Sequence, residues 1–486
     1  IFDFAPDRAL TVMAASTQVN TGVGKRTSTA QKYKMAELMN FLPIIGETGN
    51  GMKPFKVDTM LAKIKRVYAE KAVRTGFDDD SLYSDELLML KDTDLKAFND
   101  LKAIVGTTKA EKKPLKVDVN SQGLTDEEYD DAVKGQKRKP RERTPEQQAA
   151  MDKMKQLKKQ RKTMISILRS ISIRIPMMIY GMDVELDEDV NINKFIDKVD
   201  DQSWQEFMPK GVTKELFKEF SKFYDQDVFI EAGKIIRNRV KALDKIDPIE
   251  RTKQLAMIFG TFRNPDKETV LTPWRVVNMH LGKAIGGYSF YDDHYQNTTI
   301  DGVDAAHWIH TNYTNQVFNR EAHVLEINSK PGLYPLYVTT SRYYQEYEKQ
   351  KQATAGNVSE ENKRMLWQQI LRENVFCVAK TPMAKAIAKR TLTGYQDYDT
   401  NIEFVDNIVE DAKKDVKAEA NKIKEVFGNL KFDVVIGNPP YQQEAQGTST
   451  RGEAIYDSFM DLSYELSPLV TLITPGRFLF NAGSTP

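Results

Sequence analysis

The chain has 486 residues, of which 40% are hydrophobic and 29% are charged, and its formal net charge is +1. This length allows two to four domains with buried cores. The near-neutral charge excludes a global basic field, so nucleic-acid binding would have to rest on local patches. A single cysteine, Cys377, excludes an internal disulfide and predicts a reducing, cytoplasmic location.

The chain shows no sign of a membrane or secretory segment. It contains no run of about 18 uncharged apolar residues, so we expect no membrane span and no membrane partner. The first residues, IFDFAPDRAL, lack an initiator Met and the basic-then-apolar pattern of a signal peptide. We therefore expect the chain to be an internal piece of a longer protein.

Helical patterns dominate the first half of the chain. LKAFNDLKAIVG at 95–106 and the region 190–262 place apolar residues at i, i+3, i+4 and i+7, which predicts amphipathic helices. Between them, KGQKRKPRERTPEQQ at 134–148 predicts a basic linker. Inside this linker, Thr144 is a hydroxyl N-cap and Gln147 closes a capping box, so a long helix should begin here.

From about residue 270 onward, short β-rich segments alternate with helical ones. Apolar strands that alternate with helices predict an α/β fold with a doubly wound parallel sheet. The expected strands are HVLEI at 323–327, NVFCVA at 374–379, NIEFV at 401–405, DVVIG at 433–437 and LVTLIT at 469–474.

One expected strand runs directly into a loop with unusual chemistry, FDVVIGNPPY. Ligands of open parallel sheets collect at the carboxyl ends of the strands. Pro439 and Pro440 stiffen the loop and remove two N–H donors, which leaves carbonyl oxygens free to accept hydrogen bonds. Asn438 adds an amide oxygen, and Tyr441 adds a flat ring. These groups suit a planar base with an exocyclic amine better than a strand that simply ends at prolines.

The sequence Asn-Pro-Pro-Tyr after a strand resembles the catalytic motif of N6-adenine DNA methyltransferases. This resemblance implies a Rossmann-like domain that transfers a methyl group from S-adenosyl-L-methionine (S-adenosylmethionine) to the N6 of an adenine flipped out of double-stranded DNA. Asn438 and the Pro439 carbonyl would accept the hydrogens of the amine, and Tyr441 would stack on the base. Methylation of RNA or of a protein glutamine stays open, as does a degenerate scaffold that docks on DNA without catalysis.

The same resemblance implies a cofactor site on the first strand. In HVLEINSKPG, Glu326 matches the acidic residue of the family and Gly332 matches its last glycine, although an ordinary strand end remains an equal alternative. Lys330 stands where the family has a small residue. Ala379 stands where an acidic residue usually holds the ribose hydroxyls, so either another residue does this or cofactor binding is weakened.

Three further segments fit the resemblance. Thr272 and Pro273, in LTPWRVVNMHL, resemble the element that lines the methionine end of the cofactor, and they also read as a helix start. Their place ahead of the acidic strand and the catalytic motif is the gamma order of these enzymes. Asp406 is the candidate contact to the cofactor adenine, or else a helix cap. Phe478 and Phe480 would wall the base pocket or pack in the core.

Several other signals predict little. TGVGKRTS at 21–28 lacks the glycine spacing of a P-loop. The histidines do not have metal-site spacing, so no metal is expected; they are His294, His307, His310 and His323. The basic stretch at 134–162 contacts DNA phosphates or is a solvated face, and the sequence does not decide between these.

FDFAPDRAL and SIRIPMMIYG also resemble the tail of helicase motors in large single-chain restriction-modification enzymes. The expected order is a helicase-tail-like region at 1–133, a helical coupler at 134–265 and a methyltransferase domain at 266–486 that is cut short at its C-terminus. Upstream helicase and nuclease domains and a downstream target-recognition domain would belong to the same polypeptide. The chain by itself should then bind DNA poorly and without sequence choice.

Overall fold

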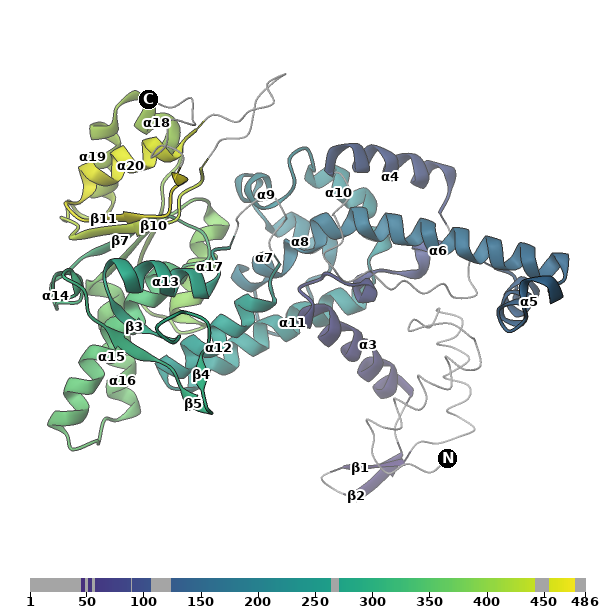
Figure 1. Ribbon diagram of the computed structural model, residues 1–486, viewed down its shortest axis with the longest axis horizontal. Helices are drawn as coiled ribbons and strands as arrows, with labels where there is room; N and C mark the ends of the chain where they lie inside the picture. Colours follow the sequence, from purple (N-terminus) through teal and green to yellow (C-terminus); the bar gives the residue numbers. More distant parts are fainter. Residues whose placement is uncertain are drawn as a thin grey trace. The chain divides into compact units, whose positions relative to one another are not determined.

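The structure of the protein is a computed structural model, shown in Figure 1, whose chain forms two compact units. It describes residues 45–48, 51–54, 57–88, 90–105, 124–263, 271–441 and 454–476. The first unit takes the described residues up to Pro176, with Asp187–Lys198 and Met208–Ile236; the second takes Met177–Leu186, Val199–Phe207 and the described residues from Arg237 onward. The three functional domains expected from the sequence, with a boundary at residue 266, stay a prediction.

The first unit is helical apart from one short hairpin of β1 (Ile45–Thr48) and β2 (Gly51–Pro54). Its helices include α3 (Val57–Arg74), α4 (Asp92–Val105), α5 (Asp126–Gln136), α6 (Pro145–Ser172), α8 (Ile192–Lys198), α10 (Lys214–Phe220) and much of α11 (Gln226–Ala242). Aromatic residues fill its core: the Phe98 ring lies 5.0 Å from that of Phe220 and 5.1 Å from that of Phe223. The helices predicted at 95–106 and 190–262 are therefore confirmed.

Helix α6 begins where the capping box predicted it. The Thr144 hydroxyl accepts a hydrogen bond from the backbone N–H of Gln147, and the Gln147 side chain accepts one from the Thr144 N–H. The expectation of a basic linker over 134–148 is wrong at both ends, because α5 extends to Gln136 and α6 starts at Pro145. The connection between these two helices contains the short 3-10 helix Pro140–Glu142.

One helical stretch among the described residues, Pro145–Gly181, is long and apolar enough to cross a membrane, although no such span was expected. Its most apolar window has a mean hydropathy of 1.2, and 89% of that window is buried inside the protein. Burial in a protein core selects the same composition, so this single helix is weak evidence for a membrane span.

A five-stranded parallel sheet forms the centre of the second unit. Its strands are β7 (Val324–Ser329), β8 (Val375–Ala379), β9 (Asn401–Phe404), β10 (Val434–Gly437) and β11 (Val470–Leu472), in the order β11-β10-β7-β8-β9. The predicted doubly wound α/β fold is confirmed. The strand order reverses between β7 and β10, which is the point where open α/β sheets bind their ligands.

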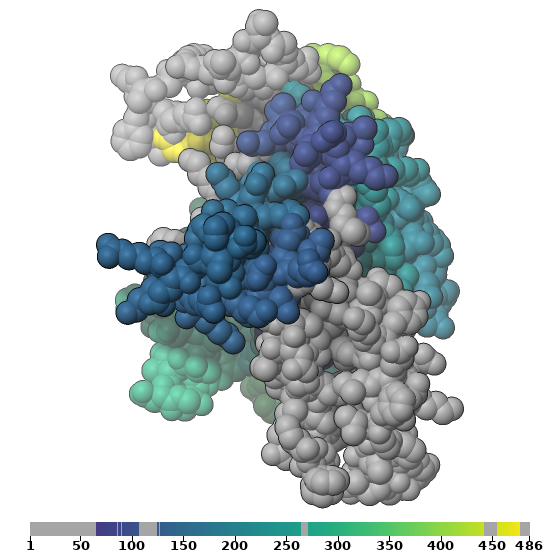
Figure 2. Space-filling model, turned by 90° about the vertical axis from the view of Figure 1, so that its right-hand side faces the viewer, coloured from purple at the N-terminus to yellow at the C-terminus, as the bar shows by residue number. Residues whose placement is uncertain are grey.

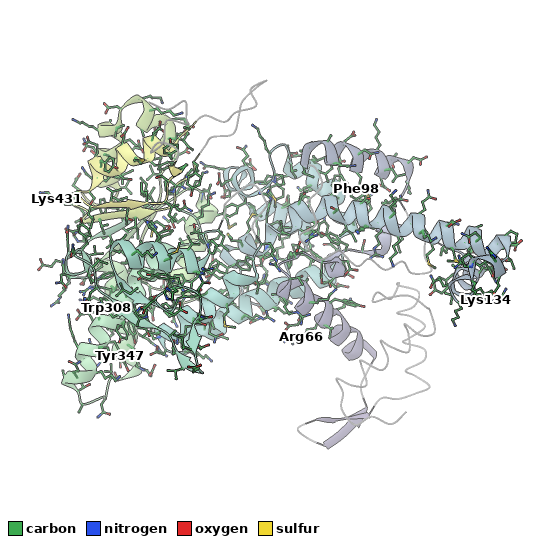
Figure 3. The ribbon with its side chains drawn as sticks, in the orientation of Figure 1. Arg66, Phe98, Lys134, Trp308, Tyr347 and Lys431 are labelled. Atoms are coloured by element: carbon green, nitrogen blue, oxygen red, sulfur yellow. The ribbon has the colours of Figure 1, made fainter. Side chains whose placement is uncertain are left out.

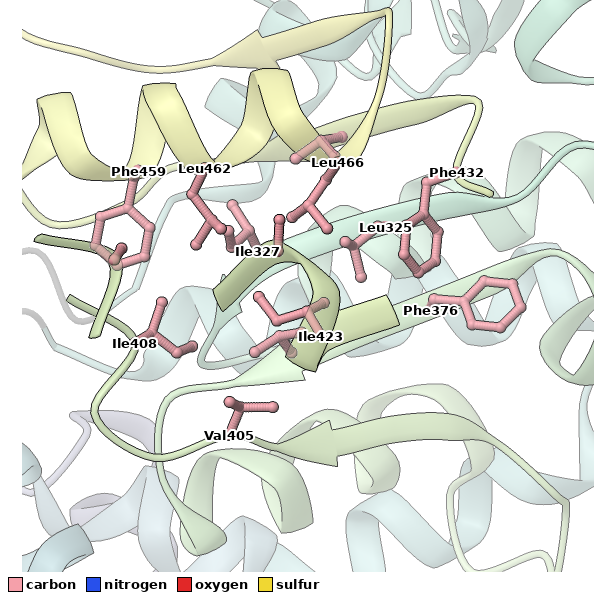
Figure 4. Packing of buried hydrophobic residues seen from close by; sticks show 14 of the residues in the cluster. Leu325, Ile327, Phe376, Val405, Ile408, Ile423, Phe432, Phe459, Leu462 and Leu466 are labelled. Carbon is pink, nitrogen blue, oxygen red and sulfur yellow. The ribbon is translucent and has the colours of Figure 1, made fainter. Parts of the chain in front are cut away.

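Helices cover both faces of this sheet (Figure 1). On one face, α18 (Ile408–Lys414), α19 (Val416–Val426) and α20 (Tyr456–Leu466) enclose a core in which Leu325 and Ile327 meet Ile423 and Leu462 (Figure 4). The other face carries α13 (Trp274–Ala284), α15 (Leu333–Ala353), α16 (Glu360–Glu373) and α17 (Pro382–Thr393). Strand residues alternate between these faces, so Glu326 points away from the cluster that holds Leu325 and Ile327.

Two upstream elements belong to the second unit although they come from the predicted coupler. Helix α12 (Pro248–Thr261) packs on α15, and the Arg251 guanidinium donates a 2.9 Å hydrogen bond to the Thr391 carbonyl. Helix α9 (Asp201–Phe207) packs on α17. Near the sheet, β3 (Gly287–Ser289) pairs with β6 (His307–Ile309), and β4 (Thr299–Ile300) pairs with β5 (Val303–Asp304).

Candidate active site at the carboxyl ends of the sheet

The Asn-Pro-Pro-Tyr loop leaves the sheet at the end of β10, beside the central strand. Gly437 has a φ of 157°, and a Cβ atom there would lie 3.0 Å from the Ile327 carbonyl oxygen of β7. The next residue, Asn438, is partly exposed, whereas the four residues of β10 are buried. The strand thus delivers Asn438 to the carboxyl edge of the sheet with its side chain accessible.

The Asn438 side chain is held at both ends of its amide. Its Nδ2 donates a 3.1 Å hydrogen bond to the Thr272 hydroxyl, and its Oδ1 accepts a 3.1 Å hydrogen bond from the Tyr441 hydroxyl. Both partners are hydroxyls, which can donate or accept, so together they hold the amide in place, with Nδ2 facing Thr272 and Oδ1 facing Tyr441. The Tyr441 backbone is fixed in turn, since its carbonyl accepts from the Ile455 N–H at 3.2 Å.

Thr272 therefore contacts the catalytic candidate rather than capping a helix. Helix α13 begins at Trp274, its cap residue is Pro273, and no side chain bonds to its first N–H groups. The interpretation of Thr272 as an N-cap is wrong, because the residue is only 9% exposed and its hydroxyl contacts Asn438 instead. Its predicted contact with a cofactor stays a prediction.

Glu326 lies in β7, in register with Ile436 of β10 and Cys377 of β8. The residue is 4% exposed, and its Oε2 atom is buried without a hydrogen-bond partner. Burial raises the pKa of the Glu326 carboxyl to about 8. The Ser329 hydroxyl lies close enough to the Glu326 carboxyl to offset part of this rise in pKa, but neither Oε2 nor the hydroxyl makes a hydrogen bond of ordinary geometry. Two orphaned polar groups at this edge are what a site lacking a polar ligand would contain.

The end of β7 and the loop that follows it are irregular. The pairing of β7 with β8 shifts register between Glu326 and Ser329, and Asn328 in the shifted segment has a φ of 59°. Gly332 has a φ of 72°, and a Cβ there would come within 2.9 Å of the Ala388 Cα in α17. Gly332 therefore serves the close packing of the loop on α17, a role that does not require a cofactor.

Lys330, the departure from the family pattern, has a partner that the sequence did not reveal. Its ammonium group lies 2.5 Å from the Glu206 carboxylate of α9, and the Lys380 ammonium group, just past β8, lies 2.8 Å from the same carboxylate. Burial opposes ionisation of Glu206, but these two cations hold its pKa below the ordinary value. An acidic group thus stands beside the end of β8, where Ala379 itself is fully buried.

Helix α9 contacts the segments that follow three neighbouring strands. Besides Glu206, its Ser203 hydroxyl accepts a 2.9 Å hydrogen bond from the Met383 N–H at the start of α17. Its Gln202 amide donates a 2.8 Å hydrogen bond to the Asp406 carboxylate after β9. A short helix from far upstream in the chain therefore covers the carboxyl ends of β7, β8 and β9.

A half-buried histidine links the two halves of this edge. His280 Nδ1 lies 3.0 Å from the Tyr334 hydroxyl, and its Nε2 lies 2.7 Å from the Thr471 hydroxyl of β11. Burial lowers the pKa of His280 to about 4, so the imidazole is neutral near pH 7 and can donate on one side and accept on the other. Burial raises the pKa of Tyr334, and the charges of Glu326 and Tyr441 raise it further, so its hydroxyl lies near both.

The predicted site residues thus divide into groups. Thr272, Asn438 and Tyr441 are in direct contact, and Glu326 lies on the adjacent strand. Asp406 lies at the same edge but is held by α9 and is exposed.

The remaining expectations have simpler outcomes. Phe478, Phe480 and the segment at 21–28 lie outside the described residues. The part of the chain that the structure describes contains no group of three or more metal-binding side chains. Glu206, Gln202 and His280 were missed, because only the tertiary fold brings them to the sheet.

Comparison with known proteins agrees with the motif. Residues 373–486 match the family described as Eco57I restriction-modification methylase. A segment of 65 residues is 38% identical to an "Uncharacterized adenine-specific methylase" of Mycoplasma pneumoniae and covers 13% of this chain and 15% of that protein. The resemblance inferred from the motif is confirmed for this C-terminal part of the chain.

Two solved structures are similar at a low level. One is an "ATP-dependent Type ISP restriction-modification enzyme LlaBIII bound to DNA", with a TM-score of 0.33 and 14% identity over 87% of this chain and 25% of that chain. The other is a nuclease-deletion mutant of the Type ISP restriction-modification enzyme LlaGI in complex with a DNA substrate mimic, with a TM-score of 0.31 and 13% identity over 86% and 30%. The chain spans less than a third of the length of each of these proteins.

Proposed function

We propose that this chain methylates the N6 of adenine in DNA as the methyltransferase part of a restriction-modification system, with S-adenosylmethionine as the methyl donor. The observation that carries the proposal is the orientation of Asn438. Its amide is held between the Thr272 and Tyr441 hydroxyls at the carboxyl edge of a parallel sheet, with Oδ1 on the side of the Tyr441 hydroxyl. The match of residues 373–486 to restriction-modification methylases supports it.

The loop supplies the groups that an exocyclic amine requires. Asn438 Oδ1 and the Pro439 carbonyl would accept the two hydrogens of the adenine amine, which localises the nitrogen lone pair for attack. The Tyr441 ring would stack on the base once it has left the duplex, worth about 1–3 kcal/mol. Because the Tyr441 hydroxyl occupies Oδ1 in this structure, base entry exchanges that hydrogen bond for one from the amine.

The cofactor half of the edge fits a polar, cationic ligand. S-adenosylmethionine supplies the methyl group when it is bound. Glu326 would hold it through the carboxylate oxygen that is buried without a partner here, and Thr272, Pro273, Gly332 and Asp406 stay candidates around it. Ionised Glu326 would be stabilised by a nearby cation, which removes the cost of burying this charge.

The proposal is tested by following a tritiated methyl group from S-adenosylmethionine into three acceptors: duplex DNA containing adenine, RNA of the same sequence, and a protein extract. We expect label in the DNA, released as N6-methyladenine on hydrolysis. Label in RNA or in protein glutamine would replace the proposal with one of those activities. No transfer, with no heat on titration of S-adenosylmethionine, would indicate a non-catalytic scaffold.

The remainder of the system also belongs to the proposal. We infer that the chain acts in the cytoplasm and that helicase, nuclease and target-recognition domains stand in the same polypeptide. The chain covers only a small part of its relatives, so the sequence of the gene on either side tests this directly. Helicase motifs upstream would support the arrangement, and a gene limited to this chain would refute it.

A further inference from the structure

Helices α5 and α6 form a tightly packed hairpin in the first unit. Leu124 and Tyr129 are buried against Met154 and Leu157 of α6. The helices approach closely at Gly135, where a Cβ atom would lie 2.8 Å from the Met151 sulfur. The hairpin therefore presents its surface residues on a fixed backbone.

The turn of this hairpin is also fixed. Arg143 Nε donates hydrogen bonds to the carbonyls of Gly135, at 2.9 Å, and Arg138, at 3.3 Å. Around it lie five exposed basic residues for which the described part of the chain provides no ion-pair partner: Lys134, Lys137, Arg138, Lys139 and Arg141. Figure 3 shows Lys134 at this end of the hairpin.

A second basic group follows one face of α6. Lys155, Lys158, Lys159 and Lys162 stand at i, i+3, i+4 and i+7, and all four are exposed. This spacing places them on one helix face over about 10 Å. Only Lys155 has a carboxylate nearby among the described residues: Asp152, at 3.7 Å, in a pair so exposed that it neutralises little.

Positive charge is concentrated in this segment against the trend of the chain. Residues 134–162 contain twelve basic and three acidic residues, a net charge of +9. The whole chain carries +1, so all other residues together carry −8. Figure 2 shows the surface of α5 and the first part of α6, in blue, facing the viewer.

We propose that the five turn residues and the four α6 lysines form one α5–α6 basic surface that binds the phosphate backbone of duplex DNA. Flexible ammonium and guanidinium groups suit phosphates, and the nine residues include no aromatic side chain that could stack on bases. The surface therefore supplies affinity without sequence choice. This proposal rests on the proposed function, in which DNA is the substrate. Of the two alternatives that the sequence left open for residues 134–162, it takes contact with DNA phosphates over a solvated face.

The test measures binding of the 486-residue chain to a labelled duplex by fluorescence anisotropy at several salt concentrations. One variant changes Lys155, Lys158, Lys159 and Lys162 to Gln, which keeps helix propensity. Another changes the five turn residues to Gln. The matched control changes four ion-paired lysines to Gln, with the same loss of four charges: Lys194, Lys218, Lys222 and Lys349. Circular dichroism verifies that each variant is folded.

The slope of log K against log salt is negative, and we expect it to become less steep by about 0.9 for each phosphate that the protein no longer neutralises. The α6 variant, which loses four charges, should therefore have a slope less steep by up to about 3.6, with at least about tenfold weaker binding at low salt. The control should bind like the wild type. Equal effects in the α6 variant and the control would overturn the proposal. If a fourfold variant unfolds, the pairs K155Q/K158Q and K159Q/K162Q carry the same comparison in smaller steps.

The outcome is separable from that of the proposed function. Methyl transfer at low salt and saturating DNA reports on the catalytic loop, whereas the salt slope reports on the basic surface. If the α6 variant keeps wild-type methyl transfer and an unchanged salt slope, the proposed DNA-binding surface is refuted and the proposed function stands. A variant that loses binding to polyglutamate but keeps binding to DNA would overturn the proposal and indicate an acidic protein partner.

Discussion

The carboxyl ends of β10 and β7 differ in how far their polar groups are satisfied. After β10, both ends of the Asn438 amide have partners, Thr272 and Tyr441. On β7, the Glu326 Oε2 atom and the Ser329 hydroxyl are buried with none. One edge of the sheet therefore holds a polar side chain that is hydrogen-bonded at both ends of its amide, next to buried polar groups that lack hydrogen bonds.

This difference teaches which half of the site depends on a ligand. A satisfied amide is already oriented, so the protein meets the cost of ordering it when it folds. A buried carboxyl without a partner is destabilising until a ligand supplies a hydrogen bond or a charge. Substitutions on β10 should therefore change the chemical step, and substitutions on β7 should change ligand affinity and stability.

The largest expected effect is that of Asn438→Ala. It removes the acceptor for the amine, and we expect methyl transfer to fall by at least about 100-fold, the cost typical of losing one group that stabilises a transition state. The affinity for S-adenosylmethionine, measured by calorimetry, should stay within about twofold. An equal loss of cofactor affinity would contradict the division in which the end of β10 serves the chemical step and the end of β7 serves ligand binding.

Glu326→Gln should have the complementary effect. A carboxylate that bonds a ligand contributes about 1.5–3 kcal/mol, so we expect the affinity for S-adenosylmethionine to fall about 10- to 100-fold. The transfer rate at saturating cofactor should change much less. The measurements are calorimetric titration and single-turnover transfer, and an unchanged affinity would exclude Glu326 from the cofactor site.

The same residue predicts a pH dependence of stability. The pKa of Glu326 is about 8 in the folded protein and 4.5 for the free group, so between these values folding takes up a proton. Stability from this group is complete below pH 4.5 and is lost as pH rises through about 8. Thermal unfolding of the wild type without cofactor should therefore shift downward from about pH 5 to about pH 8 relative to Glu326→Gln. Parallel curves for the two proteins would contradict the burial argument.

Glu206→Gln tests whether α9 belongs to the cofactor half. It leaves Lys330 and Lys380 beside a neutral amide, and both a lost acceptor and added positive potential disfavour a cationic ligand. We expect roughly tenfold weaker binding of S-adenosylmethionine, on the scale of one charged hydrogen bond. Gln205→Ala, at an exposed position of the same helix, is the control and should bind the cofactor like the wild type.

The smallest expected effect is that of Thr272→Val, which removes the acceptor of the Asn438 Nδ2 group. One hydrogen bond of about 1 kcal/mol corresponds to a loss of about fivefold in the transfer rate. The cofactor affinity should not change if Thr272 serves Asn438, and Thr272→Ser should restore the rate. If the affinity for S-adenosylmethionine falls instead, Thr272 contacts the cofactor, as the sequence suggested.

The sequence was informative where structure is local. The five strands were recognisable because each is a short β-rich segment with apolar residues between helical or polar segments, and the loop because two prolines follow a strand. Glu206 could not be found this way, since its partners Lys330 and Lys380 are far from it in sequence. The same contact explains why Lys330 stands in a position that the family fills with a small residue.

Thr272 shows a different limit. Its order in the chain placed it ahead of the acidic strand and the catalytic motif, and in the structure its hydroxyl contacts Asn438. Order does not say which neighbour a hydroxyl will bond. The helix-start pattern also led to a wrong prediction. Thr-Pro before a helix is a common N-cap, but here the Thr272 hydroxyl bonds to the Asn438 amide instead of a backbone N–H of the helix. Side-chain hydrogen bonds between distant segments are decided by packing, which a single sequence does not display.

The position of α9 has a consequence for producing the protein in pieces. A polypeptide that starts at residue 266 would contain the whole parallel sheet and the Asn-Pro-Pro-Tyr loop, and it would look complete by its motifs. It would lack Glu206, so two cations would stand unneutralised beside the proposed cofactor site. Inactivity of such a fragment would then say nothing about the enzyme. The shortest fragment worth expressing begins before Met177.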